Sequence, residues 1–348
     1  MSNAAYMQTA HSPMRKSNFE DLIEQPTPQS RPHHAPRVTV VVDACCDLPK
    51  EWLGDANVVV MPIVLEVGEW ALVDDRDPFD TVEFFRKHIA EKGAAAQSRP
   101  MSVNETRDYL IENLAADHDH VVALAISGQR SKIYMNTLSA AQQLMLMHGR
   151  ARRHAHIDTP FKMWVIDSET LFAGQGVIGA QAIAMLRQGK KAEDIVNQCS
   201  LLREHTHAFV VPQDLYYLRT RAHTKGDRSV NWLVYQLGKM LDVKPIVYAN
   251  KGVSSMLTKV RGYEEGVVKV IDYASCAIHN GLLSPFVTIS YAGDLRDVEA
   301  MPAYQLLKSN ARQKGVQVLL SHMSMTAGLN VGAGAFSLAF AARDPVFN

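Results

Sequence analysis

Short apolar runs that end abruptly in small polar residues constrain the fold more than any other feature of this chain. Three junctions share the pattern: Val38–Val42 into Asp43, Val121–Ile126 into Ser127, and Trp164–Ile166 into Asp167. Uninterrupted apolar strands are typical of parallel sheets that helices cover on both faces. Such sheets bind ligands at the carboxyl ends of their strands. Three strands that deliver hydroxyl and carboxylate groups to one edge therefore predict a binding site there.

Composition places the chain among soluble globular proteins. Its 348 residues give room for a large core and two domains. Lys plus Arg and Asp plus Glu both number 36, so the charge balance gives no argument for a nucleic-acid partner. The four cysteines have no metal-site spacing, and adjacent Cys45 and Cys46 are not a CxxC pair. Without a signal peptide or a long apolar run, the sequence predicts a cytoplasmic protein.

The order of the expected elements divides the chain into a tail and two domains. Residues 1–37 are rich in proline and poor in apolar residues, which predicts a disordered tail. Residues 38–205 alternate strands and helices, as expected for an α/β domain with a parallel sheet. Residues 206–348 are less regular, and we expect an α+β domain with a mixed or antiparallel sheet.

Periodicity and turn residues predict the individual elements. Strands are expected at 38–42, 58–66, 121–126, 163–166, 208–212, 244–249, 253–259, 286–291, 316–322 and 335–341. Helices are expected at 50–53, 80–92, 102–114, 134–147, 174–188, 192–204, 232–241, 263–279 and 301–314. Ser102 followed by Glu105 has the capping-box spacing. The glycine-rich residues 328–334 are expected to form a loop between the last two strands.

Eight short segments, in order, resemble motifs of the DegV family. They are Asp43–Pro49, Gln97–Pro100, Ser127–Tyr134, Val165–Ser168, Lys225–Arg228, Asp242–Ile246, Lys259–Gly262 and Gly328–Gly334. The resemblance implies a two-domain protein that holds one long-chain fatty acid, with the carboxylate at strand-end loops and the chain in an interdomain tunnel. In some bacteria such proteins present the fatty acid to a separate fatty acid kinase. A carrier of this kind needs neither catalytic residues nor a cofactor or metal, and its ligand is the fatty acid.

The resemblance also implies which residues meet the carboxylate. The family positions correspond here to Gln97, Ser98, Ser127 and Gly128, and Asn330 stands where the family has histidine. Amide, hydroxyl and backbone N–H groups can hold a carboxylate that has left water, because several donors share the cost of its desolvation. A turn next to Pro100 explains Ser98 as well, and a local backbone bond explains Ser127. Asn330 cannot titrate near neutral pH.

Three further residues are candidates for the head group or the rim. Arg99 and Arg130 replace residues that are usually neutral in the family. A guanidinium that turned inward would grip a carboxylate or phosphate with two hydrogen bonds, whereas the alternative is a solvent-facing arginine on a loop. Ser131 serves the loop-to-helix turn as much as a ligand.

Two arginines are candidates for contact with a partner. By resemblance, Arg228 and its loop lie near the mouth of the site, where a kinase or, transiently, a membrane would meet the protein. Arg261 precedes Gly262 at a strand-to-helix corner, where a structural ion pair is equally plausible. Asp43 and Asp47 have no partner at metal-ligand spacing, so we interpret both as structural, with Asp47 as a helix N-cap.

Two other functions remain open from the sequence. The departures at Gln97, Gly128, Asn330 and Ala44–Cys45 allow a DegV-like protein with a diverged amphipathic ligand. A small-molecule enzyme related to dihydroxyacetone kinase-like domains is the other alternative. The chain has no GxxxxGK[ST] loop and no GxSxG elbow to support it.

Overall fold

The computed structural model describes residues 36–89, 96–154, 157, 159–217 and 243–347. The predicted tail (all but residues 36 and 37), the predicted helix at 232–241 and the loop that carries Arg228 lie outside these residues.

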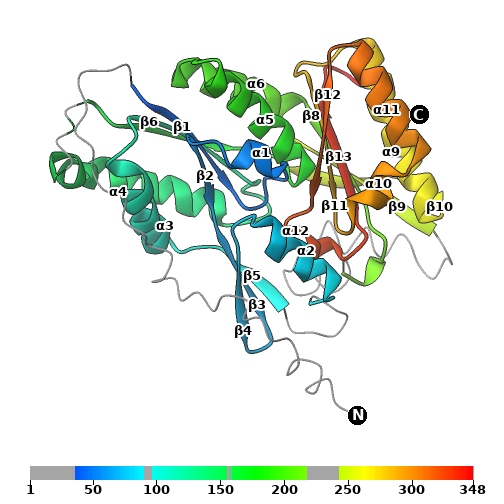
Figure 1. Ribbon diagram of the computed structural model, residues 1–348, viewed down its shortest axis with the longest axis horizontal. Coiled ribbons are helices and arrows are strands. Elements are labelled where there is room, and N and C mark those ends of the chain that lie inside the picture. Colours follow the sequence, from blue (N-terminus) through cyan, green and yellow to red (C-terminus); the bar gives the residue numbers. More distant parts are fainter. Residues whose placement is uncertain (1–35, 90–95, 155–156, 158, 218–242, 348) are drawn as a thin grey trace.

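The N-terminal domain is built on a four-stranded parallel sheet (Figure 1). Its strands are β1 (Val38–Asp43), β2 (Val58–Met61), β6 (His120–Ala125) and β7 (Lys162–Asp167), in the order β2-β1-β6-β7. Alternate residues of β1 face opposite sides, because side chains alternate along a strand. Val41 packs in one apolar core, and Val40 and Val42 pack in another. The parallel sheet is therefore covered on both faces, as predicted.

Helices supply the two coverings of this sheet. One core contains residues of α3 (Val103–Leu110), the following π-helical turn (Ile111–Ala115) and α4 (Ile133–His154). The other contains residues of α1 (Lys50–Leu53), α5 (Ala173–Arg187) and α6 (Ala192–His205). The capping box at the start of α3 is present, since the Ser102 hydroxyl accepts from Glu105 N and the Glu105 carboxylate accepts from Ser102 N.

A small antiparallel sheet was not foreseen from the sequence. The expected strand at 58–66 breaks at Pro62, which has no N–H to donate to a sheet, and the chain continues as β3 (Ile63–Val67). Strand β3 pairs with β4 (Trp70–Asp74) on one side and with β5 (Ala96–Arg99) on the other. Helix α2 (Pro78–Arg86) follows β4 and is shorter than the predicted helix at 80–92. This sheet carries the segment Gln97–Pro100 that resembles a head-group motif.

The C-terminal domain is built on a six-stranded mixed sheet, as predicted. Its strands are β8 (Thr206–Val211), β9 (Val243–Asn250), β10 (Val253–Arg261), β11 (Phe286–Tyr291), β12 (Gln317–His322) and β13 (Phe336–Ala341). The order is β10-β9-β8-β13-β11-β12, and only β11 and β12 pair in parallel. Helices α9 (Tyr263–Asn280), α10 (Leu295–Glu299) and α11 (Pro302–Gln313) pack with the face that carries Phe209, Val287 and Leu338.

The glycine-rich segment forms a helix where we expected a loop. Helix α12 (Met325–Val331) begins at Ser324, whose hydroxyl accepts from Ala327 N at 3.1 Å. Gly328 lies inside this helix, and a Cβ there would be 2.4 Å from Cε1 of Phe85. Gly328 therefore serves close packing. Gly332 (φ 91°) caps the end of the helix, and Gly334 (φ 74°) lies in the turn that follows, each with a positive φ that favours glycine.

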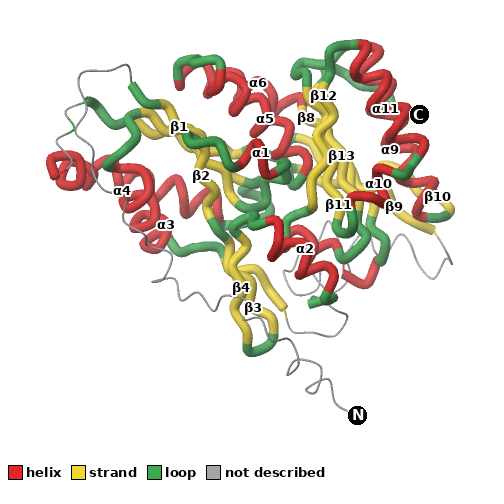
Figure 2. The backbone as a smooth tube through the Cα atoms, viewed as in Figure 1, coloured by secondary structure: helices red, strands yellow, loops and turns green. Residues whose placement is uncertain are grey.

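Helix α5 lies between the two large sheets and packs against both (Figures 1 and 2). Glycines allow the close approach: a Cβ at Gly176 would lie 2.6 Å from the carbonyl oxygen of Asp47, and one at Gly179 would lie 2.8 Å from Sγ of Cys46. One apolar core runs from Val40 of the parallel sheet through α5 to Ala339 of the mixed sheet. The boundary between residues 205 and 206 stays a prediction, because the packing is continuous across it.

Candidate functional site

The carboxylate of Asp43 ties together the strand ends where a site was predicted. It accepts hydrogen bonds from Cys45 N at 2.9 Å, Ile126 N at 2.6 Å and Gln175 Nε2 at 3.2 Å. Burial raises the pKa of Asp43 to about 6, against the opposing effect of these hydrogen bonds. Asp43 thus joins the ends of β1 and β6 to α5, which agrees with its structural interpretation.

The raised pKa of Asp43 predicts how stability depends on pH. The pKa is about 6 in the folded protein and near 3.8 in the unfolded chain, so folding favours the protonated carboxyl. This contribution is fully present below pH 3.8 and is lost as the pH rises through 6. Between pH 7 and pH 5 we expect wild type to gain about 1 kcal/mol of unfolding free energy relative to Asp43→Asn. Urea denaturation of both proteins at both pH values measures this; an unchanged difference would contradict the buried, raised pKa.

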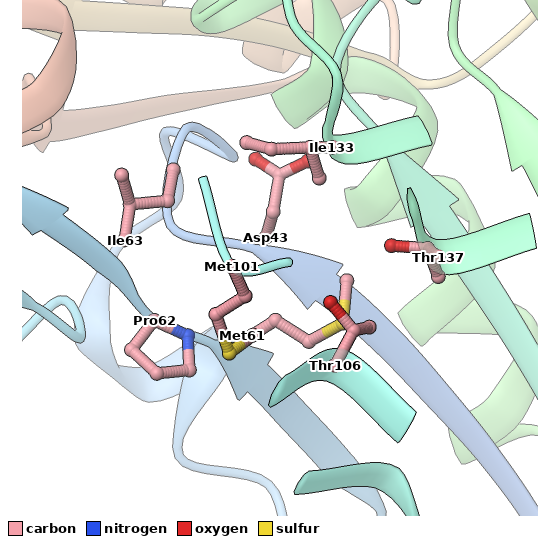
Figure 3. A pocket seen from close by; sticks show the side chains of 8 residues that line it. All are labelled: Asp43, Met61, Pro62, Ile63, Met101, Thr106, Ile133 and Thr137. Atoms are coloured by element: carbon pink, nitrogen blue, oxygen red, sulfur yellow. The ribbon is translucent and has the colours of Figure 1, made fainter. Parts of the chain in front are cut away.

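A small cavity lies beside Asp43, at the carboxyl ends of β1 and β2 and the first turns of α3 and α4 (Figure 3). It is lined by Asp43, Met61, Pro62, Ile63, Met101, Thr106, Ile133 and Thr137. Its volume of about 10 Å³ is room for about one water molecule. The lining is mainly apolar, because four of its residues belong to a large apolar core: Met61, Ile63, Met101 and Ile133. The carboxyl group of Asp43 lies at its edge.

Strand alternation separates the predicted head-group residues of β5. Ser98 lies opposite Leu65, and Gln97 lies opposite Glu66, on the neighbouring strand β3. Residues directly opposite each other share a face of the sheet. Leu65 is fully buried in the apolar core, so Ser98 lies on the core-facing side. Gln97 is exposed on the other face, where its side-chain amide donates to Glu66.

Arg99 also lies on the face of β5 away from the core. Its Nη1 is 3.0 Å from Oε2 of Glu105, and its Nε is 3.7 Å from Oε1 of Glu66. The side chain keeps 41% of its surface exposed. The structure therefore pairs Arg99 with two carboxylates of the same domain and does not bring it together with Ser98. A ligand role for Gln97 or Arg99 stays a prediction.

The loop after β6 is folded tightly around its own polar groups. Ser127 is 1% exposed, and its hydroxyl accepts from Gln129 N at 3.3 Å. The N–H of Gly128 donates to both carboxylate oxygens of Asp167 at 3.1 Å. The Ser131 hydroxyl accepts from Ile133 N at 3.3 Å, which favours its turn interpretation.

The β9–β10 turn reaches across to these strand-end loops from the C-terminal domain. Gly252 N donates to Glu169 O at 2.6 Å, and a Cβ on Gly252 would lie 3.8 Å from the Ser127 hydroxyl. Ser127 is therefore buried beneath a contact between the domains. Arg130, in the same loop, is half-buried. Arg261 is exposed at the end of β10, and its contact with a partner stays a prediction.

Asn330 lies on α12, which packs against β5 and α2. Its Nδ2 donates to Thr326 O at 2.7 Å within the helix, and the side chain is half-buried. The structure thus places the helix of Asn330 against the strand of Ser98, although the two segments are far apart in sequence. Of the predicted head-group residues, Asn330 on α12 and both Gln97 and Ser98 on β5 lie on elements in direct contact.

Sequence reasoning missed a buried charged cluster at the domain interface, which we call the Asp47–Arg76–Asp74 cluster. Arg76 Nη1 is 3.3 Å from Asp47 Oδ1, and the Arg76 side chain is 5% exposed. The expected N-cap role of Asp47 is wrong, since helix α1 has Pro49 at its N-cap and no side-chain cap. In sequence, Asp74-Asp75-Arg76-Asp77 is typical of an exposed turn, so nothing there signalled burial.

Within the part of the chain that the structure describes, no group of three or more His, Cys, Asp or Glu side chains is placed to hold a metal ion. None of the helices described has the length and apolarity needed to cross a membrane.

Comparison with known proteins identifies the family. The model of an uncharacterised protein family, DegV, matches residues 37–343. The chain belongs to the DegV family. DegV domain-containing proteins of Xanthomonas axonopodis and Xanthomonas campestris are each 39% identical to it over 312 residues, which is 90% of this chain and 99% of theirs. The family resemblance found in the sequence motifs is thereby confirmed.

Solved DegV structures share the fold. DegV of Bacillus subtilis, described as a fatty acid binding protein, has a TM-score of 0.68 at 18% identity, over 89% of this chain and 100% of its own. A stearic acid-binding protein of Eubacterium ventriosum has the same TM-score and identity, over 88% and 98%. A DegV family protein of Thermus thermophilus, described by its fatty acid binding, has a TM-score of 0.65 at 20% identity, over 88% and 100%. The predicted fold class is confirmed by these similarities.

Proposed function

We propose that this DegV protein binds a long-chain fatty acid and carries it without chemical change. The observation that carries the proposal is the core-facing position of Ser98 on β5, beside an apolar core in contact with the helix of Asn330. The fatty acid ligands of the structural neighbours support it. Membership of the family favours a carrier over an enzyme, and we propose a cytoplasmic location.

The acyl chain would lie in the apolar core that surrounds the small cavity. Each buried methylene contributes about 0.8 kcal/mol, so a long chain dominates the affinity. Because the cavity holds about one water molecule, side chains must move to admit the chain. Met61, Met101, Met323 and Met325 belong to this core, and unbranched thioether side chains adapt to irregular spaces more readily than branched ones.

The carboxylate would be held by neutral donors from Ser98, Ser127, Gly128 and Asn330, with Gln97 at the rim. In the structure the Gly128 N–H donates to Asp167 and the Asn330 amide donates to Thr326. When a ligand carboxylate binds, these donors would exchange one acceptor for another. Their hydrogen bonds would therefore set the orientation of the carboxylate more than they would add to affinity. Arg130 and Ser131 flank this position on the same loop.

We propose that the loaded protein presents its fatty acid to a separate kinase. Arg261, exposed at the end of β10, and Arg228 would face the kinase or, transiently, a membrane. Arg261→Ala separates presentation from binding, because Arg261 is exposed at the end of β10.

Blocking the cavity tests the binding site. We expect Met101→Trp to lower fatty acid affinity by about tenfold or more, because the indole fills the space that the first methylenes require. Met135→Trp is the control, since Met135 is 53% exposed on α4. Titration with acids from octanoic to stearic, followed by native mass spectrometry and checked by thermal melting, measures both variants.

The same titration separates the alternatives. A wild-type protein that stays empty with every straight-chain acid would refute the proposal. Capture of a branched or ringed amphipath from a lipid extract would instead favour a diverged ligand. Turnover of a phosphorylated small molecule would favour the enzyme.

A further inference from the structure

Helix α12 belongs in sequence to the C-terminal domain but covers the core of the N-terminal one. It follows β12 of the mixed sheet, yet it packs against α2 and β5 (Figure 1). Its side chains Met325, Ala327 and Leu329 share one apolar core with Phe84, Phe85, Met61 and Met101. This seven-residue helix is therefore a cover over the region that the proposed function assigns to the acyl chain.

The first turn of α12 is attached to the N-terminal domain through two buried carboxylates. Ser324 N donates to Asp47 Oδ1 at 2.9 Å. Thr326 donates to Asp74 Oδ2 through both its N–H and its hydroxyl, each at 2.7 Å. Arg76 lies between these groups, 3.3 Å from Asp47, and its Nη2 donates to His322 O at 2.8 Å. Three side chains of the N-terminal domain thus hold both ends of the β12–α12 connection.

This attachment is polar and incompletely satisfied, unlike the apolar packing around it. Asp74 Oδ1 and Arg76 Nε have no hydrogen-bond partner among the described residues. Two carboxylates face one guanidinium, so one negative charge is left without a counter-charge inside the cluster. Buried ion pairs return little net stability once desolvation is counted. The polar part of this contact therefore adds little to the free energy that holds α12 closed.

We propose that α12 is the gate through which a fatty acid enters the apolar core, and that the Asp47–Arg76–Asp74 cluster is the latch that keeps the gate closed. The proposal rests on the proposed function for the identity of the ligand. The closed state is the one described here, in which the neighbouring cavity is too small for an acyl chain. Opening would separate Ser324 and Thr326 from the two carboxylates and move α12 away from α2 and β5.

The ionisation of the latch gives the gate a pH dependence. Burial raises the pKa of Asp47 to about 6 and also raises the pKa of Asp74, in both cases against the lowering effect of Arg76. In the open state water would return both values toward 3.8, so protonation favours the closed state and the gate opens more readily above pH 6. The other titratable groups that face the cluster are Asp43, Cys46, Asp75 and His322.

Removal of one latch hydroxyl tests the gate. We expect Thr326→Val to speed amide exchange at Gly328 and Gly332 by about tenfold, because it deletes a hydrogen bond to a carboxylate. Thr288→Val is the matched control: it deletes a similarly buried hydroxyl that donates to Ala173 O and makes no hydrogen bond to Asp47 or Asp74. Thr326→Ser should restore slow exchange. Protection factors at pH 5 and pH 7, without fatty acid, provide the readout.

Release of bound fatty acid provides the second readout. Relative to wild type, the rate of palmitate release from Thr326→Val should rise by about the same factor as the exchange rate of its α12 amides. Thr288→Val should release palmitate at the wild-type rate. Equal α12 exchange in Thr326→Val and Thr288→Val would overturn the gate. Faster α12 exchange with unchanged release would show that α12 opens but is not the route. A protein that opens at α12 yet never binds a fatty acid would refute the proposed function and leave the latch intact.

Discussion

Replacement of Arg76 by methionine is expected to lower the free energy of unfolding by about 3–5 kcal/mol, the cost of leaving one partner of a buried ion pair uncompensated. Methionine keeps the length of the side chain but removes the only cation that the described structure places between Asp47 and Asp74. Both carboxylates are fully buried, so water cannot replace the guanidinium. Urea denaturation at pH 7, where Asp47 with its pKa of about 6 is largely ionised, measures the loss.

A neutral cluster provides the control for Arg76→Met. The triple variant Asp47→Asn, Asp74→Asn, Arg76→Met has no buried charge and keeps side chains of similar shape. It should recover most of the lost stability, because neutral replacements of buried ion pairs are often tolerated. The loss should also shrink at pH 5, where the pKa near 6 leaves Asp47 mostly protonated. A loss under about 1 kcal/mol for Arg76→Met would mean that water reaches the cluster.

The second large effect is expected at Gly176 in α5. Alanine there would place Cβ 2.6 Å from the carbonyl oxygen of Asp47 and 3.4 Å from Cγ2 of Thr288. The first neighbour is backbone, so a sheet-side loop or the helix must move. We expect a loss of about 1–3 kcal/mol, in spite of the higher helix propensity of alanine.

Gly149 provides the matched control for Gly176. It also lies inside a helix, α4, but the nearest atom to its Cβ position is the mobile end of Arg153, at 3.2 Å. Gly149→Ala should therefore raise stability by about 0.5–1 kcal/mol, the ordinary gain for a helix interior. A loss of stability for Gly176→Ala and a gain for Gly149→Ala, in thermal and urea melts, would establish that α5 is closely packed at Gly176. Equal gains in stability for the two variants would show that α5 has room for a methyl group at position 176.

Local signals in the sequence predicted most of the fold. The apolar runs of β1, β6 and β7 predicted a parallel sheet because such strands need helices on both faces. Ser102 and Glu105 predicted the start of α3 because their side chains satisfy each other's backbone donors. The start of β3 was missed because of the interruption at Pro62, and its pairing with β5 was missed because it joins residues about thirty apart.

Family position predicted candidate site residues, but how those residues lie relative to one another could not be read from the sequence. Gln97 and Ser98 are adjacent in sequence, yet strand pairing with Glu66 and Leu65 sends them to opposite faces. The role of Asp74 and Arg76 could not be read from a run of charged residues, because charge usually predicts exposure. Their burial follows from the docking of α12, a contact across about 250 residues of sequence. Helix α12 itself was hidden by three glycines that are typical of a loop.

The position of α5 has a consequence for how the chain acquires its structure during synthesis. Strands β11 and β13, which cover one side of this helix, are synthesised about a hundred residues or more after it. Until these strands are made, the small side chains and glycines on that side of α5 face water. The first half of the protein then lacks part of its apolar core. The two halves are therefore expected to mature together, late in translation, and to come apart together when denatured.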